Sequence, residues 1–175
     1  RMLEAGEDPL FICRRLVIFA GEDVGNADPQ ALVVAVAAKD AVDFIGMPEG
    51  FIPMAQAATY LATAPKSNAS YKAYLAARKA VRERPAGPIP LHLRNPVTDL
   101  MAEQGYGDGY LYPHDHPHAV VDQSYFPPGL EGTAFYFPKE IGFEREIRKR
   151  MEWREAKRAE MRGKGERKKE NGGEA

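Results

Sequence analysis

Three histidines and an aspartate stand close together in the run His114-Asp115-His116-Pro117-His118. Imidazole and carboxylate groups are good ligands for zinc or nickel, and alternate positions share one face of an extended strand. Pro113 and Pro117 instead favour a loop, and neither a cysteine nor a second pair of carboxylates completes a ligand set. We interpret the run as a surface loop. The alternative is a metal site, and with it a free-standing enzyme.

Other groups that could do chemistry are few. A phosphate-binding loop needs G-x-x-x-x-G-K-[ST], but the one Lys-Ser pair, Lys66-Ser67, follows Pro65 where the motif has glycine. We interpret His92, between two leucines, as a structural histidine and Cys13 as a small buried side chain. We therefore assign no catalytic, cofactor-binding or metal-binding residue, and we expect this chain alone neither to bind nor to hydrolyse ATP.

Positive charge is concentrated near the C-terminus, in a predicted helix with interleaved glutamates. Its basic residues are Arg145, Arg148, Lys149, Arg150, Arg154, Lys157, Arg158 and Arg162. The simpler interpretation is a solvated face on a docked helix, stabilised by local ion pairs. The alternative is a DNA-binding module that contacts the nucleic-acid backbone. Its candidate contacts are Arg148, Lys149 and Arg154 on this helix and Lys66 and Arg94 in loops.

Composition narrows the functional classes. The 175 residues are 44% hydrophobic, and 24 Lys and Arg balance 25 Asp and Glu, as in an ordinary globular chain. A single cysteine excludes an internal disulfide and fits the reducing cytosol. No apolar run approaches the roughly 20 residues of a membrane span. The chain opens on Arg1 rather than methionine, and we expect it to be a piece of a longer protein.

Periodicity and capping signals predict a mainly helical fold. We expect helices at about 9–20, 29–45, 52–64, 68–84, 96–104 and 140–162. Asp8-Pro9, Asp28-Pro29 and Asn95-Pro96 each place a capping side chain before a proline, which is favoured at the first helical position. Gly46 and Gly105 stand where C-terminal caps are needed.

Two of these helices have apolar surfaces that need cover. Residues 31–38 are apolar around the whole circumference, so Leu32, Val33 and Val36 are candidate interface residues of an oligomer. We expect a tetramer, with a dimer as the alternative. In the helix at 68–84, Tyr71, Tyr74, Leu75 and Val81 follow helical spacing together with Arg78, and we expect the apolar members to form one packed face.

From Pro85 to Pro138 the chain is rich in proline, glycine and tyrosine. We expect irregular structure there, with at most a short β-hairpin pairing residues 120–125 with 134–137. Phe143, Ile147 and Met151 form a stripe that we expect to dock the last helix. The predicted organisation is one helical domain at 1–162 and a disordered charged tail at 163–175.

Seven sequence segments, taken together and in this order, resemble one family. They are RMLEAGEDPLFICRRLV at 1–17, EDVGNADPQAL at 22–32, GMPEG at 46–50, YLATAPKSN at 60–68, PLHLRNPVTDLM at 90–101, GYGDGYLYPHD at 105–115 and YFPPGLEG at 125–132. Over about residues 1–150 the chain resembles the C-terminal region of the RarA/MgsA family of AAA+ ATPases, which is similar to the Werner-helicase-interacting ATPase.

The resemblance implies a helical domain similar to a clamp-loader collar, which assembles the ATPase into a homotetramer. It implies that ATP and magnesium bind to an AAA+ module N-terminal to this region, and that this chain itself holds no cofactor. It further implies a cytoplasmic, nucleoid-associated protein that maintains replication forks in recombination and DNA repair. The implied partners are single-stranded or forked DNA and single-stranded-DNA-binding protein, with no membrane.

Overall fold

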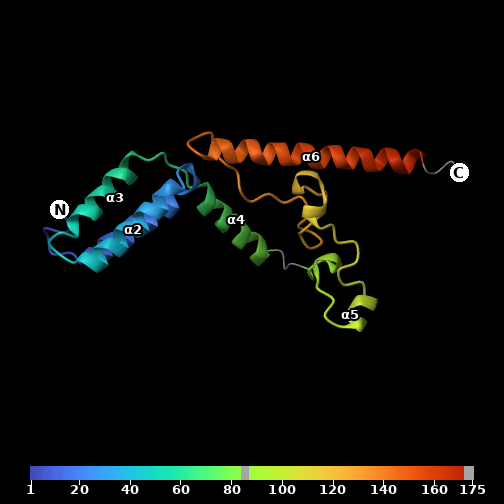
Figure 1. Ribbon diagram of the computed structural model, residues 1–175, viewed down its shortest axis with the longest axis horizontal. Coiled ribbons are helices and arrows are strands. Elements are labelled where there is room, and N and C mark those ends of the chain that lie inside the picture. Colours follow the sequence, from blue (N-terminus) through green and yellow to red (C-terminus); the bar gives the residue numbers. More distant parts are fainter. Residues whose placement is uncertain (84–86, 172–175) are drawn as a thin grey trace. The chain divides into compact units, whose positions relative to one another are not determined.

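The structure is a computed structural model that describes residues 1–83 and 87–171, with side chains up to residue 163. Six α-helices lie within these residues (Figure 1): α1 (Pro9–Phe19), α2 (Gln30–Ile45), α3 (Phe51–Thr63), α4 (Ala69–Glu83), α5 (Asp99–Glu103) and α6 (Glu144–Asn171). Short turns of other helical types are found at Ala20–Val24, Gly25–Ala27, Leu91–Leu93, Pro113–Asp115 and Pro117–Ala119. No strand forms in the described residues, so the predicted mainly helical fold is confirmed.

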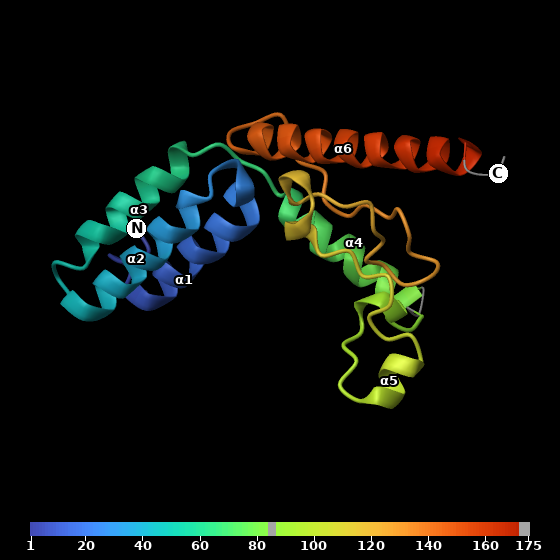
Figure 2. The same ribbon diagram turned by 45° about the vertical axis from the view of Figure 1, so that its right-hand side comes forward.

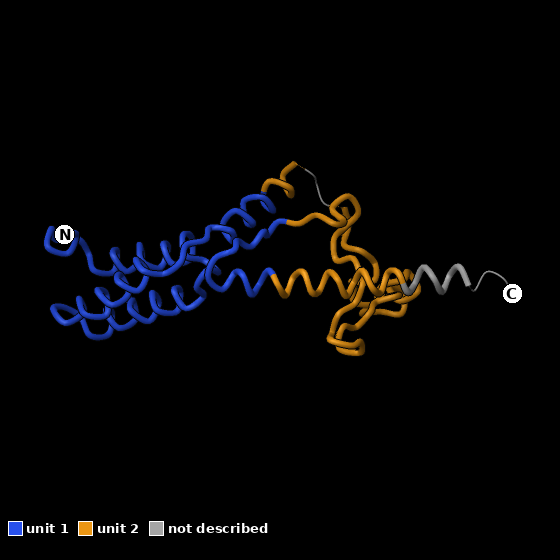
Figure 3. Tube along the Cα trace, turned by 90° about the horizontal axis from the view of Figure 1, so that it is seen from above, with its two compact units in different colours: residues 1–78, 135–148 blue, residues 79–134, 149–175 orange. Residues whose placement is uncertain are grey.

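The chain divides into two compact units by its internal contacts (Figure 3). Unit 1 consists of Arg1–Arg78 and Phe135–Arg148, and unit 2 of Lys79–Ala134 and Lys149–Ala175. Helices α4 and α6 each contribute residues to both units. The division into a domain at 1–162 and a tail at 163–175 stays a prediction.

Unit 1 is built on α1, α2 and α3, which lie side by side (Figure 2). Its main core contains Ala20, Val24, Ala31, Ala35 and Leu61, all at most 1% exposed. A second cluster joins Cys13, Val42 and Met54. Because α2 turns mainly alanines towards the core, the helices approach closely, and apart from Val42 its larger side chains are left on the other faces.

A buried polar cluster fixes the start of α6 to unit 1. The Glu144 carboxylate is fully buried and accepts hydrogen bonds from Ser67 Oγ (2.7 Å), Tyr136 OH (2.9 Å) and Lys139 N (2.7 Å). Asn26 Nδ2 in turn donates to Tyr136 OH at 3.2 Å. These bonds join three segments that are far apart in sequence, around residues 26, 67 and 136–144.

Just before α6, the backbone at Gly142 lies very close to the backbone carbonyl of Ala27. Phe143 N donates to Ala27 O at 2.8 Å, and a Cβ at Gly142, where φ is +52°, would collide with that same carbonyl. Only glycine permits both this backbone conformation and this contact.

The predicted caps have mixed outcomes. The Asp8 carboxylate accepts from Leu10 N and Phe11 N at 3.2 Å, and Gly46 (φ +76°) ends α2 as expected. Asp28 Oδ1 accepts from Gln30 N at 3.1 Å. The expected cap at Asn95 is wrong, because α5 begins at Asp99 and Thr98 provides the capping oxygen for Met101 N.

The predicted packed face of α4 is also wrong. The helix turns its alanine side inward, and Ala69 is its one buried residue. Tyr71, Tyr74, Leu75 and Val81 are 43%, 64%, 40% and 62% exposed. Helical spacing identified a single apolar face, but spacing alone does not say whether this chain provides its cover.

Unit 2 is largely irregular. The predicted hairpin is absent from the described residues: 120–125 and 134–137 form no strand pairing. Prolines at 127 and 128 follow the first segment and remove ladder donors, while Val120, Val121 and Leu130 are nevertheless buried.

The last helix differs from its predicted extent. It begins at Glu144 rather than 140, after Gly142, and its backbone continues to Asn171 instead of ending at 162. The predicted disordered tail at 163–175 thus overlaps this helix, and its residues 172–175 lie outside the described residues. Phe143 and Met151 are 39% and 41% exposed and Ile147 is half-buried, so the predicted docking stripe is only partly covered.

Candidate interaction surfaces

The predicted interface residues lie on an exposed face of α2. Leu32, Val33 and Val36 are 46%, 59% and 40% exposed, whereas the neighbouring Ala31 and Ala35 are fully buried. Since residues three and four apart share a helix face, the three side chains form one apolar surface, which we call the α2 face. The predicted interface residues therefore lie together on one exposed surface of unit 1, and their contact with another copy stays a prediction.

The Lys66 ammonium group, a candidate DNA contact, is used inside unit 1. Its Nζ donates to the carbonyls of Leu61 (2.8 Å), Ala62 (3.3 Å) and Ala64, and it lies 5.6 Å from the centroid of the Phe19 ring. A cation at the end of α3 satisfies carbonyls that lack partners within the helix. This position accounts for Lys66 without a DNA contact.

The Arg94 guanidinium is similarly engaged in unit 2. Its Nε donates to Ile89 O at 2.7 Å and its Nη1 to Tyr106 OH at 3.2 Å, and the group lies over the Tyr106 ring. These contacts fasten the loop around Leu91–Leu93. On α6, Arg148 forms an ion pair with Glu140, and Lys149 is exposed.

Arg154 lies in a concave site of unit 2, and the structure adds Arg158 to it. We call this site the arginine notch. It has a volume of about 110 Å³ and is lined by Pro113, Ala119, Val120, Val121, Tyr125, Arg154 and Arg158. Arg158 belongs to the predicted basic helix but is not among the candidate DNA contacts. The signal was its spacing of four from Arg154, which puts both guanidinium groups on one face.

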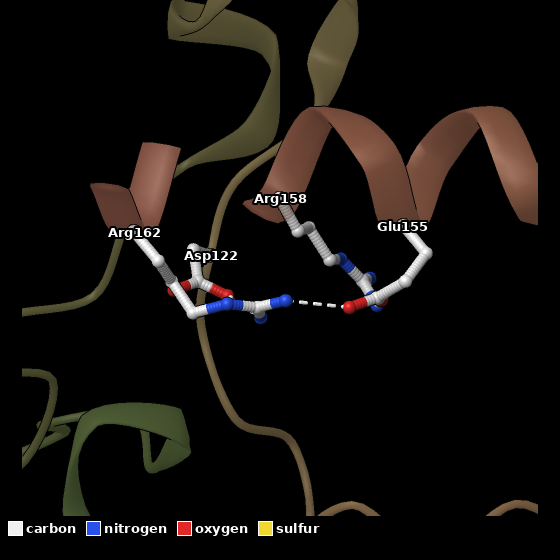
Figure 4. Close-up of polar contacts among 4 residues, drawn as sticks. All are labelled: Asp122, Glu155, Arg158 and Arg162. Atoms are coloured by element: carbon white, nitrogen blue, oxygen red, sulfur yellow. Dashed lines mark hydrogen bonds and ion pairs between the residues drawn. The ribbon is translucent and has the colours of Figure 1, made fainter. Parts of the chain in front are cut away.

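Beside the notch, Arg162 engages the nearby carboxylates. Its Nη1 lies 2.8 Å from Asp122 Oδ1 and its Nη2 lies 2.6 Å from Glu155 Oε1 (Figure 4). The hydrogen bond to Glu155 is the main cause that raises the pKa of Arg162. Arg158 Nη1 lies 3.9 Å from Glu155 Oε2, which is a longer and weaker contact.

The histidine run is not assembled as a metal site. Within the described residues, no group of three His, Cys, Asp or Glu side chains is placed to hold a metal ion. The His118 ring packs edge-on against Trp153 at 5.4 Å, and the His114 ring lies 5.2 Å from that of Tyr112. These histidines therefore take part in aromatic packing within unit 2.

Two further sequence interpretations are confirmed. His92 Nε2 donates to Ser124 O at 2.9 Å, so this histidine has a structural bond. Cys13 is fully buried, and burial, ahead of the Asp8 carboxylate, raises the pKa of its thiol. A raised pKa keeps the thiol protonated near neutral pH and disfavours nucleophilic chemistry.

None of the helices in the described part of the chain has the length and apolar character needed to span a membrane.

Comparison with known proteins matches residues 1–155 to a family described as MgsA AAA+ ATPase C terminal. The chain is 49% identical over 154 residues to replication-associated recombination protein A of Escherichia coli K12, covering 87% of this chain and 34% of that protein. The protein of the same name from Haemophilus influenzae is 48% identical over 153 residues, with 87% and 34% covered. ATPase WRNIP1 of Dictyostelium discoideum is 43% identical over 137 residues, covering 78% of this chain and 16% of that protein. The chain thus spans about a third, or less, of the length of these relatives.

Proposed function

Since this chain belongs to the MgsA AAA+ ATPase C-terminal family, we propose that it is the oligomerisation domain of a DNA-dependent AAA+ ATPase. The parent protein acts in replication-fork maintenance, recombination and DNA repair, as the name of the bacterial relatives suggests. ATP and Mg²⁺ bind to the AAA+ module of that parent, because no phosphate-binding loop occurs in this sequence.

The observation that carries the proposal is the α2 face. Three large aliphatic side chains, Leu32, Val33 and Val36, are between 40% and 59% exposed on a rigid helix of unit 1. Apolar side chains gathered on one exposed surface are a mark of protein–protein contact, because burying them in an interface removes them from water. The α4 side chains Tyr71, Tyr74 and Leu75 provide a second such surface in the same unit.

In this proposal the copies form a homotetramer. A cyclic four-fold assembly needs two different surfaces on each copy, one that meets the preceding copy and one that meets the next, with a quarter turn between neighbours so that the ring closes. The exposed faces of α2 and α4 meet that requirement. Single-stranded or forked DNA and single-stranded-DNA-binding protein are then partners of the assembled parent.

Sedimentation equilibrium at micromolar concentration tests the assembly. We expect a tetramer for the parent chain and a shift towards monomer for Val33→Asp/Val36→Asp. Each aspartate would be desolvated in the interface, so association should weaken by at least about 100-fold. The matched control is Ile89→Asp/Val97→Asp in unit 2, which alters side chains that are 63% and 75% exposed.

The outcomes separate two parts of the proposal. A monomeric parent chain at these concentrations would contradict oligomerisation itself. A tetramer that survives the α2 substitutions would leave oligomerisation standing but remove the α2 face as its site. Circular dichroism of each variant checks that helix content is retained.

A further inference from the structure

The arginine notch contains more positive charge than its surroundings neutralise. The two carboxylates beside it, Asp122 and Glu155, are both engaged by Arg162, at 2.8 and 2.6 Å. Figure 4 shows the dashed hydrogen bond from Arg162 to Glu155, with the Arg158 side chain beside that carboxylate; Arg158 Nη1 is 3.9 Å from Glu155 Oε2, a longer contact than the 2.6 Å of Arg162 Nη2. No ion pair or hydrogen bond of the Arg154 side chain occurs among the described residues, so Arg154 and Arg158 remain as the cations that face the notch.

Hydrogen-bond donors in this part of unit 2 also lack acceptors. Arg158 Nε is buried and has no partner, and the same holds for Gln123 Nε2. Gln123 stands between the lining residues Val121 and Tyr125 in sequence. Among the described side chains these are the two buried nitrogen or oxygen atoms without a hydrogen bond, and both are donors. A buried donor without an acceptor costs free energy, which a ligand rich in acceptors can recover.

The volume and the lining residues of the notch limit the kinds of ligand that it can bind. A volume of about 110 Å³ accommodates a small group such as a phosphate, or several waters, but not a folded peptide segment. Guanidinium groups bind phosphate through paired N–H donors, and two of them, one turn apart on a helix, can hold a single phosphate. At 45% exposure, Tyr125 is accessible on the lining and offers a flat aromatic face on which a base can stack.

We propose that the arginine notch binds a phosphate group through Arg154 and Arg158. The phosphate is either the backbone phosphodiester of a nucleic-acid strand or a free phosphate ion. Arg162 supports the site by drawing the carboxylates of Asp122 and Glu155 away from it. This inference does not depend on oligomerisation, because the notch lies in unit 2 and the α2 face lies in unit 1.

The test is the binding of a fluorescein-labelled oligothymidylate, followed by fluorescence anisotropy at low salt. For Arg154→Ala/Arg158→Ala we expect a loss of affinity of about tenfold or more, since one charge-assisted hydrogen bond of 1.4 kcal/mol corresponds to a factor of ten. The matched control Arg14→Ala/Arg15→Ala removes the same charge from exposed positions of α1 and should change the affinity by less than about twofold.

Two further variants separate the effect of the guanidinium donors from that of charge alone, and from a loss of folding. Arg154→Lys/Arg158→Lys preserves charge but removes the fork of donors, and we expect an affinity between those of the parent and the double alanine variant. Arg154→Ala alone breaks no ion pair of the described chain and should fold normally while losing part of the affinity. Displacement of the bound oligonucleotide by inorganic phosphate or pyrophosphate identifies the free ion as a ligand, and its failure identifies the backbone phosphodiester.

Either source of phosphate supports the proposal when the notch variants lose binding and the control does not. Equal losses in the notch and α1 variants would overturn it, because binding would then follow net charge alone. Absence of binding to the oligonucleotide, to phosphate and to pyrophosphate would overturn it as well.

Discussion

Glu144 is an acidic side chain that is fully buried at the first residue of α6. Its carboxylate accepts from Ser67 Oγ, Tyr136 OH and the Lys139 backbone nitrogen. Burial raises the pKa of the Tyr136 phenol; the hydrogen bond from Asn26 lowers it, and the hydrogen bond to Glu144 raises it again, so the phenol stays a donor at neutral pH. A buried carboxylate that accepts from three donors holds its segments in one arrangement, because breaking one of these bonds would leave a polar group without its partner.

Glu144→Ala should lower the free energy of unfolding by about 3 kcal/mol, because three donors would be left without their acceptor inside unit 1. Glu140→Ala is the matched control. Its side chain is 75% exposed and pairs with Arg148 at the surface, so the expected change is below about 1 kcal/mol. Urea denaturation followed by circular dichroism measures both. Equal stability of the two variants would contradict the role given to the buried cluster.

Residue types alone were a poor guide to which basic side chains are available for a ligand. Lys66 and Arg94 were candidate DNA contacts, but each donates to backbone carbonyls that folding brings within reach. Those acceptors belong to the end of α3 and to Ile89, and sequence spacing does not identify them as partners. Arg154 and Arg158 both line the notch, and their spacing of four, which places them on one helix face, is visible in the sequence; a DNA contact of Arg154 stays a prediction.

At the scale of elements, the existence of all six helices could be predicted because apolar periodicity and capping residues are local signals. The residues at which the helices begin and end could not be predicted, nor could which of their apolar faces are buried within this chain. Asp8 and Asn95 both precede proline, yet only Asp8 of these two caps a helix, since the residues after Asn95 are not helical and α5 begins at Asp99. The exposed apolar side chains of α4 illustrate the same limit, because amphipathic spacing is compatible with burial by a partner.

Asp8→Ala should lower the free energy of unfolding by about 1 kcal/mol, because Leu10 N and Phe11 N lose their acceptor at the start of α1. Asn95→Ala provides the comparison from the same sequence signal and should change stability by less than about 0.5 kcal/mol. Thermal melts followed by circular dichroism resolve the difference. A larger effect at Asn95 than at Asp8 would contradict the structure and favour the cap that sequence analysis predicted.

At the scale of the whole molecule, each unit contains a surface that points to a different task. Unit 1 has a core of small residues and leaves large apolar side chains exposed on α2 and α4. Unit 2 has the arginine notch, with aromatic and cationic lining. This separation allows assembly and phosphate binding to be altered by different substitutions, so each proposal can fail without the other.

Thermal stability should depend on protein concentration if the α2 face is covered in an oligomer. Association stabilises the folded state by mass action, so the Tm of the parent chain should rise by several degrees over a 100-fold increase in concentration. For Val33→Asp/Val36→Asp the Tm should be independent of concentration, because exposed aspartates on α2 prevent association without disturbing the alanine core at Ala31 and Ala35. Differential scanning calorimetry at two concentrations measures the effect. A concentration-independent Tm for the parent would mean that its exposed apolar faces remain in water, and the oligomerisation proposal would then fail on thermodynamic grounds.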